Sequence, residues 1–465
     1  MGRFVQPDHQ PNDIPNNTGV QHSEDQRTAT PNNTPKTGIE METIPPSAVC
    51  TFVGEGAANV VFELSGVEDH PGLHGQLLRL PKDESNGPTY AELQAYWQDR
   101  VSPLFKPHEL VQQRLVKLPQ EPAFFDRLNL QLHEIEEKNK RRRDFAGQRF
   151  VAEAMNTGML VEDMRPRKAG APRPASRPSS SGAAKAKAKG KAKAEEEPDD
   201  SSSEDEEDLF TLHEIKPKWL HQSPRAPDGA EQCRNCAREV QRNIKNGSRN
   251  PVFCPLNLVK ATDFPRNQNV AVDIRNGLRL TSSEADNLKK WLHDSDLLRR
   301  LRTKQWDLDH CPKKVVPPAL ESGGSSSGGA SAATSATTVA QSSGAEEDAE
   351  EDNVARYCLA MTLRDCSLFL RIPRLPVAEG GEVVAKLADL DKKNYGTKHE
   401  YWEGMEDDLH EQNLYSRKGA NGLSGKLTNC QLPFYKANFK NLDDQVRAYY
   451  RLPLRQPPGG AQSSN

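Results

Sequence analysis

Three long stretches of this 465-residue chain are too poor in large apolar side chains to build a hydrophobic core. Residues 1–46 are rich in Pro, Asn, Thr and Gln. Residues 165–208 run from a Lys/Ala block into an acidic block, and residues 321–352 are mostly Gly, Ser and Ala. Such segments cannot repay the entropy lost on ordering. We therefore expect a disordered leader, a charged insertion, a flexible linker and a disordered tail at 456–465.

The rest of the chain is long enough for one large domain or two lobes, and its patterns predict a mixed α+β fold. Expected strands, rich in β-branched and aromatic residues, cover 49–53, 59–64, 75–80 and 158–164. Helical spacing of apolar residues covers 90–100 and a charged segment at 129–145. Later segments predict a strand within 209–220, a helix running into a strand within 354–372, and a strand within 381–394.

Charge and cysteine usage exclude several classes. Lys and Arg number 62 against 66 Asp and Glu, a formal charge of −4, so the chain is no general nucleic-acid or membrane polycation. Eight scattered cysteines fit a reducing compartment, and no apolar run approaches the ~20 residues of a membrane span. We therefore expect a soluble, monomeric, intracellular protein. The Lys-rich block could also be a nuclear-localisation signal, so the expected location is the nucleus or the cytoplasm.

A glycine-rich turn separates the first two expected strands. In GEGAAN, Gly54 and Gly56 would let backbone amides approach a phosphate closely, although a plain hairpin turn explains the pattern as well. Arg79 follows on the third strand, where it either faces phosphates or is an ordinary exposed strand arginine.

Two basic patterns suit a polyanionic ligand. In EIKPK, Pro217 fixes a turn that aims Lys216 and Lys218 from a rigid base. Arginines then recur at i, i+4 and i+8 and share one helix face, which is either solvated or binds an anion. They are Arg234, Arg238 and Arg242.

Cys233 and Cys236 form a C-x2-C pair, with Cys254 and His221 as conceivable further metal ligands. A zinc site needs four ligands at recognisable spacing, and no second C-x2-C or H-x3-H is present. We therefore favour ordinary buried thiols over a zinc site.

Acidic residues stand beside two expected strands. Asp365 precedes one, while Asp389 and Asp391 end another and are followed by Lys392 and Lys393. Carboxylates at adjacent strand ends could hold Mg²⁺ of a nucleotide and accept a proton from a hydroxyl; two unrelated surface loops explain them equally well.

Together these segments resemble the inositol-pentakisphosphate 2-kinase family, in a fungal-type form with long insertions. GEGAANVVFEL, QLLRLPK, EIKPK, CRNCAREVQRN, FCPLNL, RDCSLFL and DLDKK occur in the family's order. The resemblance implies a two-lobed kinase fold distantly related to protein kinases, with lobes at 47–164 and 209–455. It implies transfer of phosphate from ATP, with Mg²⁺, to the 2-hydroxyl of inositol 1,3,4,5,6-pentakisphosphate. Another inositol phosphate as substrate, or a non-catalytic scaffold that binds inositol phosphates, are the alternatives.

The resemblance also implies roles for individual residues. Asp365 would be the general base and Lys216 a catalytic cation, while Asp389 would hold Mg²⁺. The nucleotide would contact Gly54, Glu55, Gly56, Ala57, Ala58, Asn59, Arg79, Glu214 and a hinge formed by Glu162, Asp163 and Met164. The substrate's phosphates would contact Lys218, Arg234, Arg238, Arg242, Asn269, Lys393 and Tyr401.

Some positions depart from the family's pattern. DLDLKP is DLDKKN here, and Thr397, with Lys398 beside it, stands where an arginine is expected. Arg238 takes the place of a histidine, and Asn267 is an alternative match to Asn269. The zinc ligands that plant-type members have before the DCS segment have no counterpart, because Cys311 is isolated.

Overall fold

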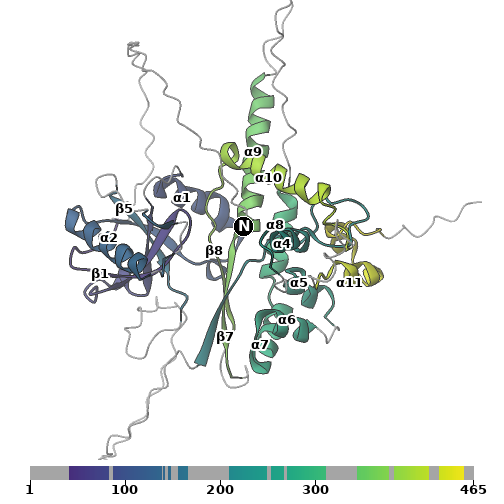
Figure 1. Ribbon diagram of the computed structural model, residues 1–465, viewed down its shortest axis with the longest axis horizontal. Helices are drawn as coiled ribbons and strands as arrows, with labels where there is room; N and C mark the ends of the chain where they lie inside the picture. Colours follow the sequence, from purple (N-terminus) through teal and green to yellow (C-terminus); the bar gives the residue numbers. More distant parts are fainter. Residues whose placement is uncertain are drawn as a thin grey trace, which may run out of the picture. The chain divides into compact units, whose positions relative to one another are not determined.

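The computed structural model confirms a mixed α+β fold (Figure 1). It describes residues 41–82, 87–138, 140–141, 145–147, 155–165, 209–248, 253–265, 270–309, 343–375, 382–417 and 429–454. The strands are β1 (Val49–Glu55), β2 (Asn59–Ser65), β3 (Gln76–Pro81), β4 (Gln113–Lys117), β5 (Thr157–Glu162), β6 (Phe210–Ile215), β7 (Ser367–Pro373) and β8 (Val384–Ala388). The helices are α1 (Tyr90–Tyr96), α2 (Pro122–Glu137), α4 (Arg234–Lys245), α5 (Leu256–Asp263), α6 (Val270–Leu278), α7 (Ser282–Asp294), α8 (Leu297–Asp307), α9 (Ser343–Asp365), α10 (Tyr395–Glu411), α11 (Leu432–Ala437) and α12 (Asp444–Tyr449).

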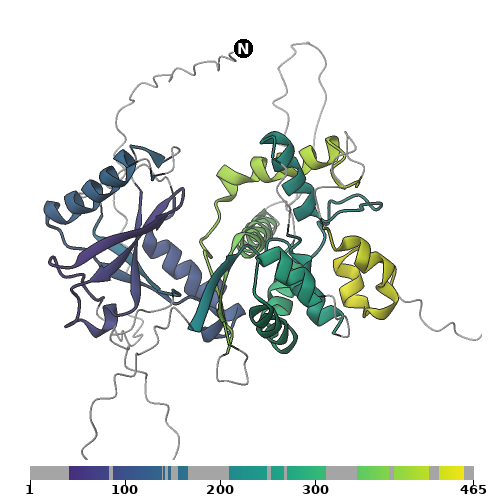
Figure 2. The ribbon, with the colours of Figure 1, turned by 60° about the horizontal axis from the view of Figure 1, so that its bottom comes forward.

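The first sheet has the strand order β1-β2-β3-β5-β4, and its paired neighbours are antiparallel. Helix α2 packs beside β1 (Figure 2). Phe124 and Phe125 of the helix share a buried core with Phe62 and Leu78 of the sheet. Gly158 in β5 is part of this packing, because a Cβ there would lie 2.9 Å from Leu118 Cδ2.

Two sequence predictions for the first part of the chain need correction. Residues 41–46 were assigned to the disordered leader, but Thr43 pairs with Lys117 of β4 and Ile44 is completely buried. The charged helix expected at 129–145 is α2, which begins at Pro122 and ends at Glu137. Its apolar first turns, rather than its charged end, fix it to the sheet. Strand β4 was not predicted.

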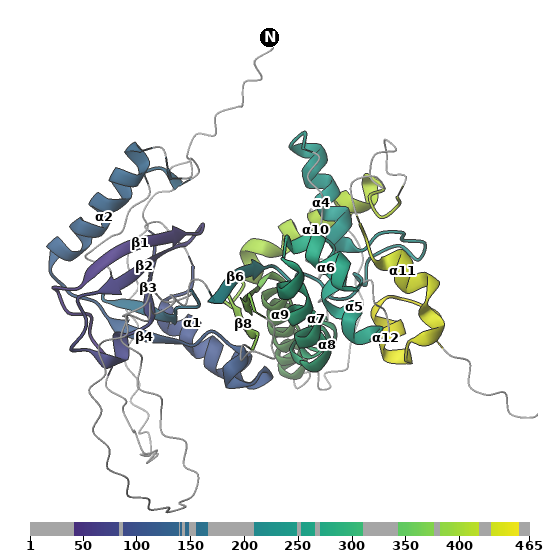
Figure 3. The same ribbon diagram turned by 90° about the horizontal axis from the view of Figure 1, so that it is seen from below.

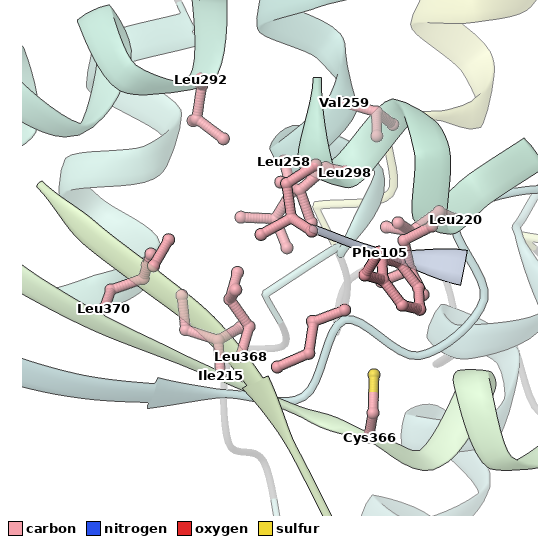
Figure 4. Close-up of a cluster of buried hydrophobic side chains, with 14 of the residues drawn as sticks. Phe105, Ile215, Leu220, Leu258, Val259, Leu292, Leu298, Cys366, Leu368 and Leu370 are labelled. Atoms are coloured by element: carbon pink, nitrogen blue, oxygen red, sulfur yellow. The ribbon is translucent and has the colours of Figure 1, made fainter. Parts of the chain in front are cut away.

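The second sheet has the order β6-β7-β8, again antiparallel, and packs against helices. Figure 4 shows Ile215 of β6 and Leu368 and Leu370 of β7 pointing toward Leu258 and Leu298 of the helices. Helix α5 lies against α6, α7 and α8, and α8 lies against α9 (Figure 3). Aromatic residues after Tyr415 pack into a buried cluster with α4.

Helix α9 corrects the boundary of the flexible linker expected at 321–352. The helix begins at Ser343, so the acidic residues at the end of that range are helical. It ends at Asp365, where the chain turns directly into β7.

The segment between α1 and β4 joins the two sheets. Trp97, Phe105 and Leu110 of this segment are buried in the core of the second sheet, and Leu110 forms a bridge with Leu387 of β8. No helix in the described part of the chain is long and apolar enough to span a membrane.

Candidate active site

Two neighbouring cavities in the described structure have one lining residue in common. The first, of about 480 Å³, lies where strands of both sheets meet, and we call it the apolar cavity. The second, of about 780 Å³, lies among β6, α4, α9 and α10, and we call it the cationic cavity. Glu214 of β6 lines both, so ligands in the two cavities would be neighbours.

The apolar cavity combines a mainly apolar lining with a glycine hairpin. Its apolar walls are Val53, Val61, Leu77, Val111, Val161, Leu212, Phe369 and Leu387. The predicted hairpin turn is confirmed: β1 and β2 are antiparallel, and the Gly56 N–H donates to the Asn59 carbonyl at 2.8 Å. A Cβ built on Gly54 or Gly56 would meet no atom within 4 Å. Neither glycine is required by its own packing, and both leave room beside the cavity.

The other residues of the predicted glycine loop differ in whether they line the apolar cavity. Asn59 lines the apolar cavity. The bend at Ala57 and Ala58 is exposed and outside the cavity lining. The buried Glu55 carboxylate pairs with Lys82 and Arg141, so its side chain is engaged within the protein.

Arg79 is not the exposed strand arginine of the alternative interpretation. Its side chain is 12% exposed and lines the apolar cavity, and its guanidinium donates two hydrogen bonds to the Asp391 carboxylate. Burial lowers the pKa of Arg79, but the charge of Asp391 more than compensates and holds it above its ordinary value. A permanent cation from β3 therefore reaches the segment after β8.

The predicted hinge lies at the end of β5. Glu162, Asp163 and Met164 all line the apolar cavity. The Glu162 N–H donates to the Gln112 carbonyl at 2.9 Å, and its carboxylate accepts a hydrogen bond from Lys386 of β8. Asp163 pairs with Arg165.

Asp365 lies in the cationic cavity between two lysines. Its carboxylate accepts hydrogen bonds from Lys218 Nζ at 2.9 Å and Lys393 Nζ at 2.8 Å. Burial raises the pKa of Asp365, but the two ammonium groups lower it more, to about 2. This half-buried carboxylate is therefore ionised at neutral pH.

Lys216 connects the two predicted acidic residues. Its ammonium lies 2.7 Å from the Asp389 carboxylate and 3.5 Å from the Asp365 carbonyl. Burial lowers its pKa, yet Asp389 raises it above the ordinary value. Lys218 and Asp389 have φ of 53° and 58°, the left-handed region that non-glycine residues rarely adopt. The interpretation as two unrelated surface loops is wrong.

The predicted arginine stripe on α4 faces the cationic cavity, where all three members contribute to the lining. Arg234 is buried, pairs with Glu406 at 2.7 Å and lies over the Trp219 ring. Arg238 donates to Gln241 and Arg242 pairs with Glu239. The carboxylates of Glu406 and Glu239 thus offset part of the repulsion among the three like charges.

Lys393 and the half-exposed Tyr401 also line the cationic cavity, whereas Asn269 and Asn267 lie outside the described residues. Sequence reasoning did not assign Arg364 or Lys398 to the site. Lys398 lines the cavity, and Thr397 is outside the lining. Arg364 is buried over Trp219 and pairs with Asp309.

His221 is not a metal ligand beside the C-x2-C pair. It is fully buried, and its ring nitrogens bond to the Gln222 carbonyl at 2.8 Å and to Arg364 Nη2 at 3.2 Å.

The apolar cavity therefore adjoins a cavity lined by lysines and arginines, the arrangement of a class of proteins that hold an anionic ligand beside an apolar one. Comparison with known families is more specific: the inositol-pentakisphosphate 2-kinase model matches residues 52–408, and the chain belongs to this family. A protein of Yarrowia lipolytica named inositol-pentakisphosphate 2-kinase is 28% identical over 224 residues. That match covers 47% of this chain and 58% of the relative, so the chain spans little more than half of its length.

Proposed function

We propose that this protein transfers the γ-phosphate of ATP to the 2-hydroxyl of inositol 1,3,4,5,6-pentakisphosphate, forming inositol hexakisphosphate. We further propose that its two sheets belong to the two lobes of a kinase fold distantly related to protein kinases. One observation carries the reaction: a carboxylate, Asp365, lies inside a cavity whose cations come from several separate elements, directly beside an apolar cavity.

The apolar cavity suits ATP. Its apolar walls would hold the adenine beside the hinge at Glu162, Asp163 and Met164. The space beside Gly54 and Gly56, which side chains would fill, lets phosphates approach backbone N–H groups closely. Arg79 supplies a fixed positive charge on the same side.

Asp389 fits the binding of Mg²⁺ through its carboxylate, the hard oxygen ligand that this ion prefers. The Asp389 side chain is about half exposed and lines the apolar cavity, next to the shared Glu214. Bound Mg²⁺ neutralises charge on the transferred phosphate. Lys216, already held by Asp389, points its ammonium toward the same place and adds a second positive charge.

The cationic cavity suits a substrate with five phosphates. Binding so many negative charges requires cations from several directions, and arginine forks add bidentate geometry. The cavity collects these cations from the turn after β6, from α4, α9 and α10, and from the segment between β8 and α10. They are Lys216, Lys218, Arg234, Arg238, Arg242, Arg364, Lys393 and Lys398.

Asp365 performs the proton step. A carboxylate that is ionised at neutral pH accepts a hydrogen bond from the attacking hydroxyl and then its proton. Lys218 and Lys393 fix its orientation, and they are also the nearest partners for substrate phosphates. The carboxylate is thereby positioned beside the hydroxyl to be phosphorylated.

The test is a chromatographic assay of the purified protein with Mg²⁺-ATP and inositol 1,3,4,5,6-pentakisphosphate, with inositol hexakisphosphate as the standard. We expect the hexakisphosphate as product. Asp365→Asn should lower kcat at least about 100-fold, the usual size of general-base catalysis, and leave pentakisphosphate affinity nearly intact. Asp407→Asn is a matched control, because Asp407 pairs with Arg225 outside both cavities.

Tight pentakisphosphate binding without turnover by the wild type would instead identify a binding protein. Full activity of Asp365→Asn would remove the general-base role. The monomeric state and the nuclear or cytoplasmic location stay predictions.

A further inference from the structure

Four cysteines from distant parts of the chain gather in one buried cluster. Cys233 and Cys236 belong to the start of α4, Cys254 precedes α5, and Cys430 precedes α11. Their sulfur atoms all lie within 4.8 Å of one another, and at most 7% of any of these residues is exposed. The cluster lies outside the linings of the two cavities that form the candidate active site.

We propose that these four thiolates bind one structural Zn²⁺ ion. A tetrahedral zinc centre with four sulfur ligands has Zn–S bonds of ~2.3 Å, which place neighbouring sulfurs ~3.8 Å apart. Cys233 Sγ and Cys254 Sγ are 3.8 Å apart. The remaining distances, up to 4.8 Å, need to shorten only slightly for all four sulfurs to reach one ion.

The backbone around the cluster is arranged to stabilise thiolates. The Cys233 N–H donates to Cys430 Sγ at 3.2 Å, and the Gln431 N–H donates to Cys254 Sγ at 3.4 Å. Cys233 caps the N-terminus of α4, where the helix dipole favours negative charge. On binding, each thiol loses its proton to solvent as its sulfur forms a bond to zinc.

The sulfur spacing distinguishes a single-ion site from a four-iron cluster and from ordinary packing of thiols. A four-iron cluster holds its ligand sulfurs farther apart than 4.8 Å, because the cluster itself lies between them. Ordinary packing of cysteines in an apolar core gives no reason for four sulfur atoms to converge around one position. Each of the other described cysteines, Cys50, Cys358 and Cys366, lies outside the cluster.

Zinc at this position would join three elements that are distant in sequence. It would tie the start of α4 to the chain before α5 and to the chain before α11, all of which share one hydrophobic cluster. Because α4 also carries Arg234, the ion would hold the helix that lines the cationic cavity. The site is structural, since its four positions leave no place for a substrate or water.

Metal analysis of the full-length protein tests this proposal. After expression in zinc-containing medium and dialysis against a weak chelator, we expect about one zinc per chain by inductively coupled plasma mass spectrometry. Cys430→Ser should lose most of this zinc and unfold at a lower temperature. Cys358→Ser, which changes a buried cysteine outside the cluster, should keep it.

A second measurement does not depend on the folding of a variant. Titration of wild-type protein with an organomercurial should release one zinc, detected by a colorimetric chelator, as the cluster's thiols are modified. A wild-type protein that is folded but metal-free, contains iron instead, or shows a disulfide among these cysteines by intact mass would overturn the proposal. Loss of zinc from Cys358→Ser as well as from Cys430→Ser would overturn the assignment of the ligands.

Discussion

At the scale of single residues, the charged groups of the candidate site neutralise one another. Asp365 pairs with Lys218 and Lys393, and Asp389 pairs with Lys216. Phosphates that enter the cavities would compete with these carboxylates for the same cations. Binding therefore exchanges one set of ion pairs for another, so affinity depends on the cations that keep no strong internal partner.

Lys398 tests this reasoning, because it lines the cavity beside the position where an arginine was expected. Lys398→Gln should weaken pentakisphosphate affinity roughly tenfold, the size of one charge-assisted hydrogen bond, and leave ATP affinity unchanged. Isothermal titration with each ligand separately measures both. Thr397→Ser is the control, since the Thr397 backbone N–H donates to the Asn394 side chain that caps α10, and Thr397 is outside the lining. Equal loss in both variants would contradict a direct role of Lys398.

His221 predicts a pH dependence of stability. Burial, reinforced by the charge of Arg364, lowers the pKa of His221 well below its ordinary value of 6.5. Below pH 6.5 the unfolded chain binds a proton here and the folded protein does not. The free energy of unfolding should therefore fall with decreasing pH, by up to about 1.4 kcal/mol per pH unit.

Urea unfolding of wild type and His221→Gln between pH 7.5 and 5 measures this effect. The variant should be less stable at pH 7.5, because the bonds to Gln222 and Arg364 change, and its stability should fall less steeply. His293→Gln is the control, since His293 is exposed. Parallel pH profiles of wild type and His221→Gln would show that His221 does not carry the slope.

At the scale of elements, two glycines are expected to have different roles: Gly54 of the hairpin in nucleotide binding and Gly158 of β5 in packing. Gly54→Ala should leave the unfolding temperature nearly unchanged, because its Cβ meets nothing, and raise the KM for ATP several-fold by filling space beside the cavity. Gly158→Ala should lower the unfolding temperature and leave the KM for ATP nearly unchanged. Its Cβ lies 2.9 Å from Leu118 Cδ2 and 3.0 Å from Leu78 Cδ1, and such overpacking costs about 1–3 kcal/mol.

Steady-state kinetics and thermal melts of the two alanine variants check this pair. A Gly54→Ala protein with wild-type KM for ATP would show that the hairpin does not approach the nucleotide.

Local patterns predicted most elements of the fold. The strands at the glycine turn and the helix that runs into β7 follow from period and composition, which the chain carries locally. Strand β4 was missed because its five residues, QRLVK, include three polar ones. The boundaries at 41–46 and 343–352 were wrong because pairing with β4 and continuation of α9 override local composition.

The sequence was enough to predict which residues belong to the site. It was not enough to predict which of them pair with one another. EIKPK, the arginine stripe and the acidic strand ends gave the residues that meet in the two cavities. Cys430, which is 176 positions beyond Cys254, completes its cluster only through tertiary packing, so no spacing rule could find it. Arg79 was foreseen, whereas its pairing with Asp391 joins elements that lie far apart in sequence.

At the scale of the whole molecule, the segment between α1 and β4 joins the first sheet to the core of the second. We expect wild-type protein to unfold in a single calorimetric transition for this reason. Phe105→Ala removes a buried ring from that core, at a cost of about 3–5 kcal/mol, and should lower the transition temperature and broaden or split the transition. Leu130→Ala, at a position 60% exposed on α2, should change neither. An unchanged transition in Phe105→Ala would show that this segment does not couple the two cores.

Glu214 has a consequence for how the two ligands affect each other's binding. Its carboxylate accepts a hydrogen bond from Ser367 at 2.6 Å and belongs to both cavities. A ligand in one cavity changes the electrostatic potential at this carboxylate, and a ligand in the other cavity experiences that change. Any such coupling is reciprocal, because the two binding free energies share one thermodynamic cycle. Each ligand should thus alter the affinity of the other by the same factor, through one shared charge and without any moving part.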